Sequence, residues 1–221
     1  MTKLLLRLFV PHSGDPADPK SRAAIGSLSG IVGIVCNLLL FTGKLLTGIL
    51  TGSVSITADA MNNLSDASSA IVTLIGFRLA ARPADEDHPY GHARFEYLSG
   101  LAVAVMIILI GFELGKSSLE KLLNPTPVEF GLIPAAVLMA SILIKLWLSR
   151  FNRELGGMIR SAALEATAAD SRNDCISTGA VLIAGAAEHF LNWRLDGLFG
   201  LGVAAFILWS GWNLARDTIS P

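Results

Sequence analysis

The chain has 221 residues, of which 52% are hydrophobic and only 16% are charged. Soluble domains carry about 25% charged residues, so this composition, with a mean hydropathy of +0.57, indicates a membrane protein. The net charge of −1 gives no basis for nucleic-acid binding. Cys36 and Cys175 both stand in apolar sequence and are interpreted as packing residues, not as a disulfide or a metal pair.

Residues 1–24 form a short N-terminal segment that is not a signal peptide. Its apolar run is interrupted by Arg7 and is followed by proline, glycine and charged residues. We expect this segment to lie at the cytoplasmic surface of the membrane. We expect the membrane domain to be 25–217 and 218–221 to be its C-terminal end.

Residues 25–217 contain several apolar segments of the length that crosses a bilayer, which is about 20 residues. They predict an all-α protein, a bundle of six transmembrane helices. The predicted spans, in chain order, are 25–49, 55–80, 94–118, 130–149, 161–187 and 195–215. The second and fifth spans are the most polar, and we expect a hydropathy plot to score them lowest.

Basic residues counted with the loops, including several near the ends of the spans, fall mostly on one side of the predicted membrane. Three lie on the far side, namely Lys116, Lys121 and Arg194, and twelve lie on the side of the N-terminus: Lys3, Arg7, Lys20, Arg22, Arg78, Arg82, Arg94, Lys145, Arg150, Arg153, Arg160 and Arg216. Cytoplasmic loops carry the excess of positive charge, so both termini are predicted to be cytoplasmic. Lys44 lies within a span and is expected to snorkel or to pair with an acid.

Two polar pairs interrupt the second and fifth spans. Asn62 and Asp66 stand four residues apart, and so do Asp170 and Asp174. On a helix this spacing places both side chains on one face, about 6 Å apart along the axis. Both pairs fall near the predicted bilayer midplane, on helices that run antiparallel. Ionisable residues at that depth mark functional sites, and carriers bind their substrates there.

The four side chains of these pairs predict a site for a divalent cation. Three carboxylates and the carbonyl oxygen of Asn62 form an all-oxygen set, which favours Mn²⁺ over Zn²⁺ because no histidine or thiolate belongs to it. Crowded carboxylates repel one another at low dielectric, so a bound cation would displace a proton, which is a route to antiport. The alternative is that these residues only form hydrogen bonds between helices.

A second candidate site precedes the third span. Asp85, His88 and His92 follow the order Asp-x-x-His-x-x-x-His, and on a helix they would bind a metal such as Zn²⁺ at the cytoplasmic mouth. Pro89 and Gly91 weaken the helical assumption. A polar turn that orients the start of the third span is an equally supported interpretation.

Three stretches of sequence carry a resemblance to a known family. ADAMNNLSDASS, the HPYGH that begins 22 residues after Asp66, and AADSRNDCIST resemble the cation diffusion facilitators over nearly the whole chain. The resemblance implies a homodimeric exporter of divalent metal from the cytoplasm, driven by proton antiport and seated in the cell membrane. Asn62 and Asp170, at positions where zinc-transporting members commonly carry His or Asp, are similar to the manganese-type members. Asp85, His88 and His92 match a second metal site of some members.

Members of that family usually continue into a cytoplasmic metal-binding domain of ferredoxin-like fold. The sequence shows no counterpart of that domain, so we expect the chain to be an isolated membrane domain without the cytoplasmic one. The resemblance also implies a protein that is not an enzyme and has no cofactor besides the transported ion. Export of Zn²⁺, Fe²⁺ or Cd²⁺ is an alternative, and so is a passive channel. Paired membrane aspartates also occur in intramembrane aspartyl proteases, but no GxGD-type motif surrounds Asp66 or Asp170.

Overall fold

The fold was analysed in a computed structural model, which describes residues 2, 6, 19–80, 93–191 and 195–219. In these residues the chain forms long helices and no strand. The helices are α2 (Pro19–Thr51), α3 (Val54–Ala80), α4 (Ala93–Leu123), α5 (Leu132–Ile159), α6 (Ala162–Leu191) and α7 (Asp196–Ile219). Each predicted span coincides with one of these helices, so the predicted all-α architecture is confirmed.

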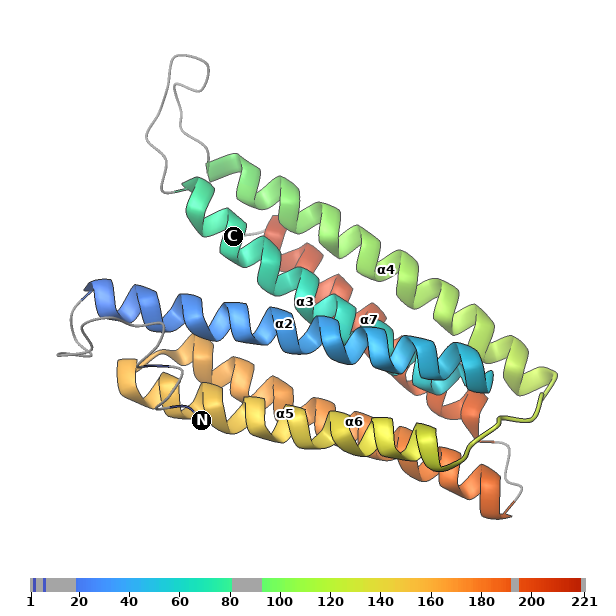
Figure 1. The fold of residues 1–221 in the computed structure, drawn as a ribbon. Coiled ribbons are helices and arrows are strands. Elements are labelled where there is room, and N and C mark those ends of the chain that lie inside the picture. The colour runs from blue at the N-terminus through green and yellow to red at the C-terminus, as the bar shows by residue number, and fades with distance from the viewer. Residues whose placement is uncertain (1, 3–5, 7–18, 81–92, 192–194, 220–221) are drawn as a thin grey trace.

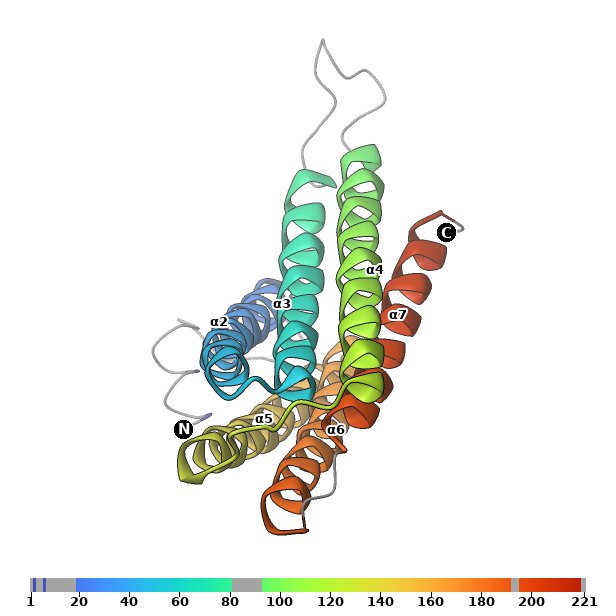
Figure 2. The same cartoon turned by 90° about the vertical axis from the view of Figure 1, so that its right-hand side faces the viewer.

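The helices form two groups that cross each other. α3, α4 and α7 lie side by side, while α2, α5 and α6 run across them (Figures 1 and 2). α2 ends at Thr51 and α3 begins at Val54, and the two helices are close at this end of the bundle. They diverge toward the opposite end (Figure 1). α3 and α6, which carry the polar pairs, run antiparallel and make only a short contact.

The surface of the bundle is that of an integral membrane protein. Four segments are long and apolar enough to cross a bilayer: Ala24–Thr51, Leu101–Leu123, Leu132–Ile159 and Asp196–Arg216. Within the described residues α3 and α6 do not reach this criterion, as predicted for the two most polar spans. Large apolar side chains are exposed on the outside of most helices, including Leu39, Phe112, Leu143, Ile183 and Trp209. A continuous apolar exterior of this kind faces lipid.

Two apolar clusters hold the helices together. The larger one packs Ile56 of α3 against Ile107 of α4 and Ile207 of α7, and it extends to α5 and α6. The smaller one joins α2 to α5. α7 passes so close to α4 that a Cβ atom on Gly197 would lie 2.8 Å from the backbone nitrogen of Leu122. Small residues permit such close helix contacts in membranes.

Asp196, the first residue of α7, caps the start of α3. Its carboxylate accepts hydrogen bonds from the backbone nitrogens of Val54 and Ser55, at 2.8 and 3.2 Å, and from the hydroxyls of Ser53 and Ser55, at 2.6 and 2.5 Å. Lys121 Nζ lies 3.6 Å from the same carboxylate. The first N–H groups of a helix lack partners within it and favour a negative charge. Asp196 therefore fastens α3, α4 and α7 at one end of the bundle.

We expect Asp196→Ala to lower the free energy of unfolding. Buried donors at the start of α3 lose their acceptor, which costs about 1–3 kcal/mol. Thermal unfolding of the purified protein in detergent measures the change, and Glu120→Ala on the exposed side of α4 is the control. An Asp196→Ala variant as stable as the Glu120→Ala variant would show that this contact contributes nothing to stability.

Candidate metal site

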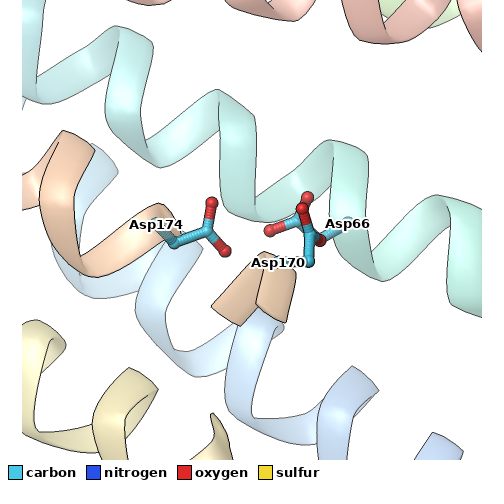
Figure 3. Close-up of side chains that lie close together, drawn as sticks. All are labelled: Asp66, Asp170 and Asp174. Atoms are coloured by element: carbon cyan, nitrogen blue, oxygen red, sulfur yellow. The ribbon is translucent and has the colours of Figure 1, made fainter. Parts of the chain in front are cut away.

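The aspartates of the two polar pairs converge between α3 and α6. Asp66, Asp170 and Asp174 each place one carboxylate oxygen within 4.8 Å of the others, and Figure 3 shows the three side chains directed toward one another. Asp174 is buried, Asp66 is half-buried and Asp170 is exposed. The cluster is therefore closed around Asp174 and open to the surroundings at Asp170.

Asn62 belongs to the same cluster. Its Nδ2 donates a 2.9 Å hydrogen bond to Oδ1 of Asp174, and the side chain is buried. The predicted ligand atom of Asn62 is its carbonyl oxygen, whereas the structure directs the amide nitrogen toward the carboxylate. For Asn62 to bind a cation shared with Asp174, the amide group has to rotate so that Oδ1 replaces Nδ2.

Small buried side chains stand beside the polar pairs in α3 and α6. Ala60 and Ala67 on α3 and Ala168 on α6 are all buried near the polar pairs. Residues of this size let helix backbones approach each other in a membrane.

A lysine that the sequence analysis placed elsewhere completes the cluster. Lys145 of α5 is 1% exposed, and its Nζ lies 3.0 Å from Oδ2 of Asp66 and 2.5 Å from Oδ2 of Asp174. The charge count assigned Lys145 to the cytoplasmic loops, and this assignment is wrong. Lys145 falls within the predicted span 130–149, near its end, and was nevertheless counted with the loops; α5 continues to Ile159, so Lys145 lies well inside the helix.

The sequence did contain a signal for this position. Eight of the ten buried residues of α5 recur at intervals of three and four: Pro134, Leu138, Ser141, Lys145, Leu148, Asn152, Leu155 and Ile159. This spacing defines the inward face of a helix. Lys145 falls on that face, between two other polar residues, and a helical projection of 132–159 would have identified it.

A second buried ion pair lies one helical turn from the cluster. Lys44 of α2 donates to Oδ2 of Asp59, at 2.8 Å, and to Oγ1 of Thr178, at 3.0 Å, while the Thr178 hydroxyl donates to Asp59. All three side chains are at most 1% exposed. Of the two alternatives predicted for Lys44, snorkelling and pairing with an acid, the structure shows the pairing. Asp59 and Thr178 stand one turn from Asn62 and Asp174, on the side where α2 and α3 meet.

Breaking this pair on one side should destabilise the protein strongly. We expect Lys44→Met to cost about 3–5 kcal/mol, because Asp59 is left buried without a compensating charge. The double variant Lys44→Met/Asp59→Leu removes both charges and should recover most of that loss. Chemical denaturation of the single and double variants measures the difference. Equal stability of the two variants would contradict a tight ionic coupling.

A cavity of about 520 Å³ opens between α6 and α7 next to the cluster. Its α6 wall carries the polar residues Asn173, Asp174 and Ser177, and its α7 wall is apolar, with Phe199 and Phe206 among its residues. Asp174 therefore borders both the carboxylate cluster and an open space in the bundle.

Other polar residues singled out by sequence lie apart from the cluster. Asp85, His88 and His92 fall outside the described residues, so their metal site stays a prediction. Cys175 directs its sulfur toward backbone carbonyls of Ile142 and Ser171, in keeping with a packing role.

Comparison with known proteins assigns the chain to a family. Residues 30–221 match the family model described as the cation efflux transmembrane domain. The chain is 32% identical over 177 residues to an uncharacterized transporter of Methanocaldococcus jannaschii, a match covering 80% of this chain and 62% of that protein. It is 30% identical over 194 residues to the manganese efflux system protein MneS of Bacillus subtilis, covering 87% and 67%. For the cation-efflux pump FieF of Cronobacter sakazakii the figures are 32% over 199 residues, covering 90% and 64%.

A helical membrane protein with an acidic cluster held between two of its helices has the form of an ion carrier. This chain belongs to the cation efflux family, whose members are transporters. It spans about two-thirds of the length of the three relatives named above. The family gives no support to the alternative of an intramembrane aspartyl protease.

Proposed function

We propose that this chain is the membrane part of a divalent metal exporter whose transported ion binds at Asn62, Asp66, Asp170 and Asp174. The observation that carries the proposal is the convergence of three carboxylates from α3 and α6 within 4.8 Å. Carboxylates at such a distance repel one another, and the single charge of Lys145 offsets only part of that repulsion, so the cluster favours a bound cation. The membrane location of the cluster makes it a transport site in preference to a structural one.

Mn²⁺ is the ion that we assign to the site. Every side chain in the proposed set binds through oxygen, and carboxylate and carbonyl ligands suit Mn²⁺ better than Zn²⁺, which prefers imidazole and thiolate. A relative named as a manganese efflux protein supports the same ion. Export of Zn²⁺, Fe²⁺ or Cd²⁺ by the same site is the second candidate, since other relatives are named only as cation-efflux pumps.

The proposed topology has six membrane spans with both termini in the cytoplasm. Residues 25–217 are then the transport domain, and 1–24 and 218–221 are its cytoplasmic ends. The divergence of α2 and α3 and the exposure of Asp170 lie toward the cytoplasmic side, while the Lys44–Asp59 pair lies toward the opposite side. This arrangement favours entry of the metal from the cytoplasm. We assign the chain to the cell membrane and, from the family resemblance, to a homodimer.

Proton antiport is the proposed source of energy. A cation that enters a group of crowded carboxylates competes with the protons bound there, so metal and protons would occupy the site alternately. In this scheme the metal leaves on the far side when protons return through the same residues. A passive channel requires no such exchange, and the coupling of the two fluxes separates the two mechanisms.

Transport by purified protein in liposomes tests the function. We expect Mn²⁺ to accumulate in the vesicles when the lumen is acidic, with protons leaving as the metal enters. Addition of Zn²⁺, Fe²⁺ or Cd²⁺ as competitors ranks the ions. Preferential movement of Zn²⁺ would overturn the assignment of Mn²⁺, and metal flux without proton flux would indicate a channel.

A further inference from the structure

Lys145 occupies the position between Asp66 and Asp174 that a bound metal needs. Its ammonium lies 3.0 Å from Oδ2 of Asp66 and 2.5 Å from Oδ2 of Asp174. Small divalent cations bind carboxylate oxygens at about 2.0–2.6 Å, and a metal that shares these two oxygens would therefore lie within van der Waals distance of the ammonium. Two cations cannot occupy this space together.

We propose that Lys145 is a tethered cation that competes with the transported metal for these carboxylates. In the metal-free protein the ammonium neutralises part of the acidic cluster and holds α3, α5 and α6 together. When the metal enters, the ammonium swings away without losing its proton. When the metal leaves, the ammonium returns and takes over its oxygens. This inference rests on the proposed function, and it makes Lys145 a residue that sets affinity and release.

The surroundings of Lys145 fit such a movement. Its side chain is a flexible four-carbon stem that carries a point charge. Ser141 lies one turn earlier on the same buried face of α5, and within the described part of the chain its hydroxyl has no hydrogen-bond partner. Side chains on a helix lean toward its N-terminus, which is the direction of Ser141. The Ser141 hydroxyl is therefore a ready acceptor for the displaced ammonium.

The other buried lysine, Lys44, has different partners. It pairs with Asp59 and Thr178, outside the proposed ligand set. Of these two lysines, Lys145 is the one that contacts the carboxylates of the proposed metal site. Replacing the Lys44–Asp59 pair by neutral residues should therefore leave metal affinity unchanged.

Titration of Mn²⁺ into the protein in lipid nanodiscs, at constant pH, tests the proposal. Free Mn²⁺ is followed by electron paramagnetic resonance. If the competing ammonium leaves the site open in about 1–10% of molecules, Lys145→Gln should lower the Kd about 10–100-fold. Lys145→Arg should raise the Kd, because a guanidinium binds two carboxylates more firmly than an ammonium does. The control Lys44→Gln/Asp59→Asn should keep the wild-type Kd.

Transport kinetics supply a readout that a purely structural lysine would not change. In liposomes, Lys145→Gln should lower both KM and the maximal rate, since the metal binds more tightly and leaves more slowly. A Kd for Lys145→Gln equal to or above that of the wild type would overturn the proposal. If Lys145→Gln does not fold, a Lys145→Arg variant with the wild-type Kd would overturn it equally.

One further variant separates this inference from the proposed function. Asp174→Asn removes a charge from the ligand set while preserving the shape of the side chain. Wild-type protein that binds Mn²⁺ no better than Asp174→Asn would refute the metal site itself. Loss of binding in Asp174→Asn, combined with an unchanged Kd in Lys145→Gln, would refute only the competition by Lys145.

Discussion

Asp174→Ala is expected to abolish metal transport. Asp174 is the buried member of the cluster and the one in contact with both Asn62 and Lys145. Loss of an outer hydrogen-bond partner of a metal ligand typically costs about 10–100-fold in affinity, and loss of the ligand itself should cost more. Uptake of Mn²⁺ into liposomes by wild-type and variant protein measures the effect.

Two further variants distinguish a loss of metal binding from a loss of folded structure. Asp174→Asn keeps the volume of the side chain and an oxygen that accepts from Asn62, and it should also fail to transport. Glu113→Gln changes an exposed carboxylate on α4 and should transport at the wild-type rate. Transport at the wild-type rate by folded Asp174→Ala would mean that the metal crosses the protein by another route.

Asn62→His is expected to shift the preference of the transporter from Mn²⁺ toward Zn²⁺. The side chain of Asn62 lies against Asp174, so an imidazole at this position is placed to join the ligand set. Imidazole nitrogen favours Zn²⁺ over Mn²⁺. We expect the ratio of Zn²⁺ to Mn²⁺ transport to rise by roughly tenfold, the lower end of the effect of a changed metal environment.

Asn173→His is the matched control for that change. Asn173 adjoins Asp174 in sequence, but its side chain is exposed, so a histidine there should leave the metal preference as it is. Asn62→Asp adds a hard oxygen ligand and should retain Mn²⁺. Identical metal ratios for wild-type protein and Asn62→His would remove Asn62 from the ligand set.

Hydropathy and spacing were enough to predict the helices and the meeting of the acids. Apolar segments of membrane length become helices because no other structure satisfies their backbone groups in lipid. The inward orientation of Asp66 and Asp174 then follows from the rule that charged side chains in a membrane face the interior of the bundle. The pairing of Lys44 was predictable for the same reason, although its partner Asp59 could be chosen only from the structure.

The role of Lys145 was not predicted, because the charge count considered only where basic residues fall along the chain. The count took Lys145 as a loop residue because it lies four residues before the predicted end of its span at 149, whereas α5 continues to Ile159 and buries it. Asn63, a buried polar residue of the same helix as Asp66, donates its Nδ2 to the backbone oxygen of Asp59 in α3 itself. Local partners of this kind depend on side-chain rotation, which helical periodicity does not define.

Anomalous diffraction from crystals grown with Mn²⁺ tests the central claim most directly, because it locates the ion among named side chains. We predict one Mn²⁺ bound by carboxylate oxygens of Asp66, Asp170 and Asp174, with the ammonium of Lys145 turned away from them. Crystals saturated with Mn²⁺ in which Lys145 still holds Asp66 and Asp174, and in which the metal lies elsewhere, would contradict it.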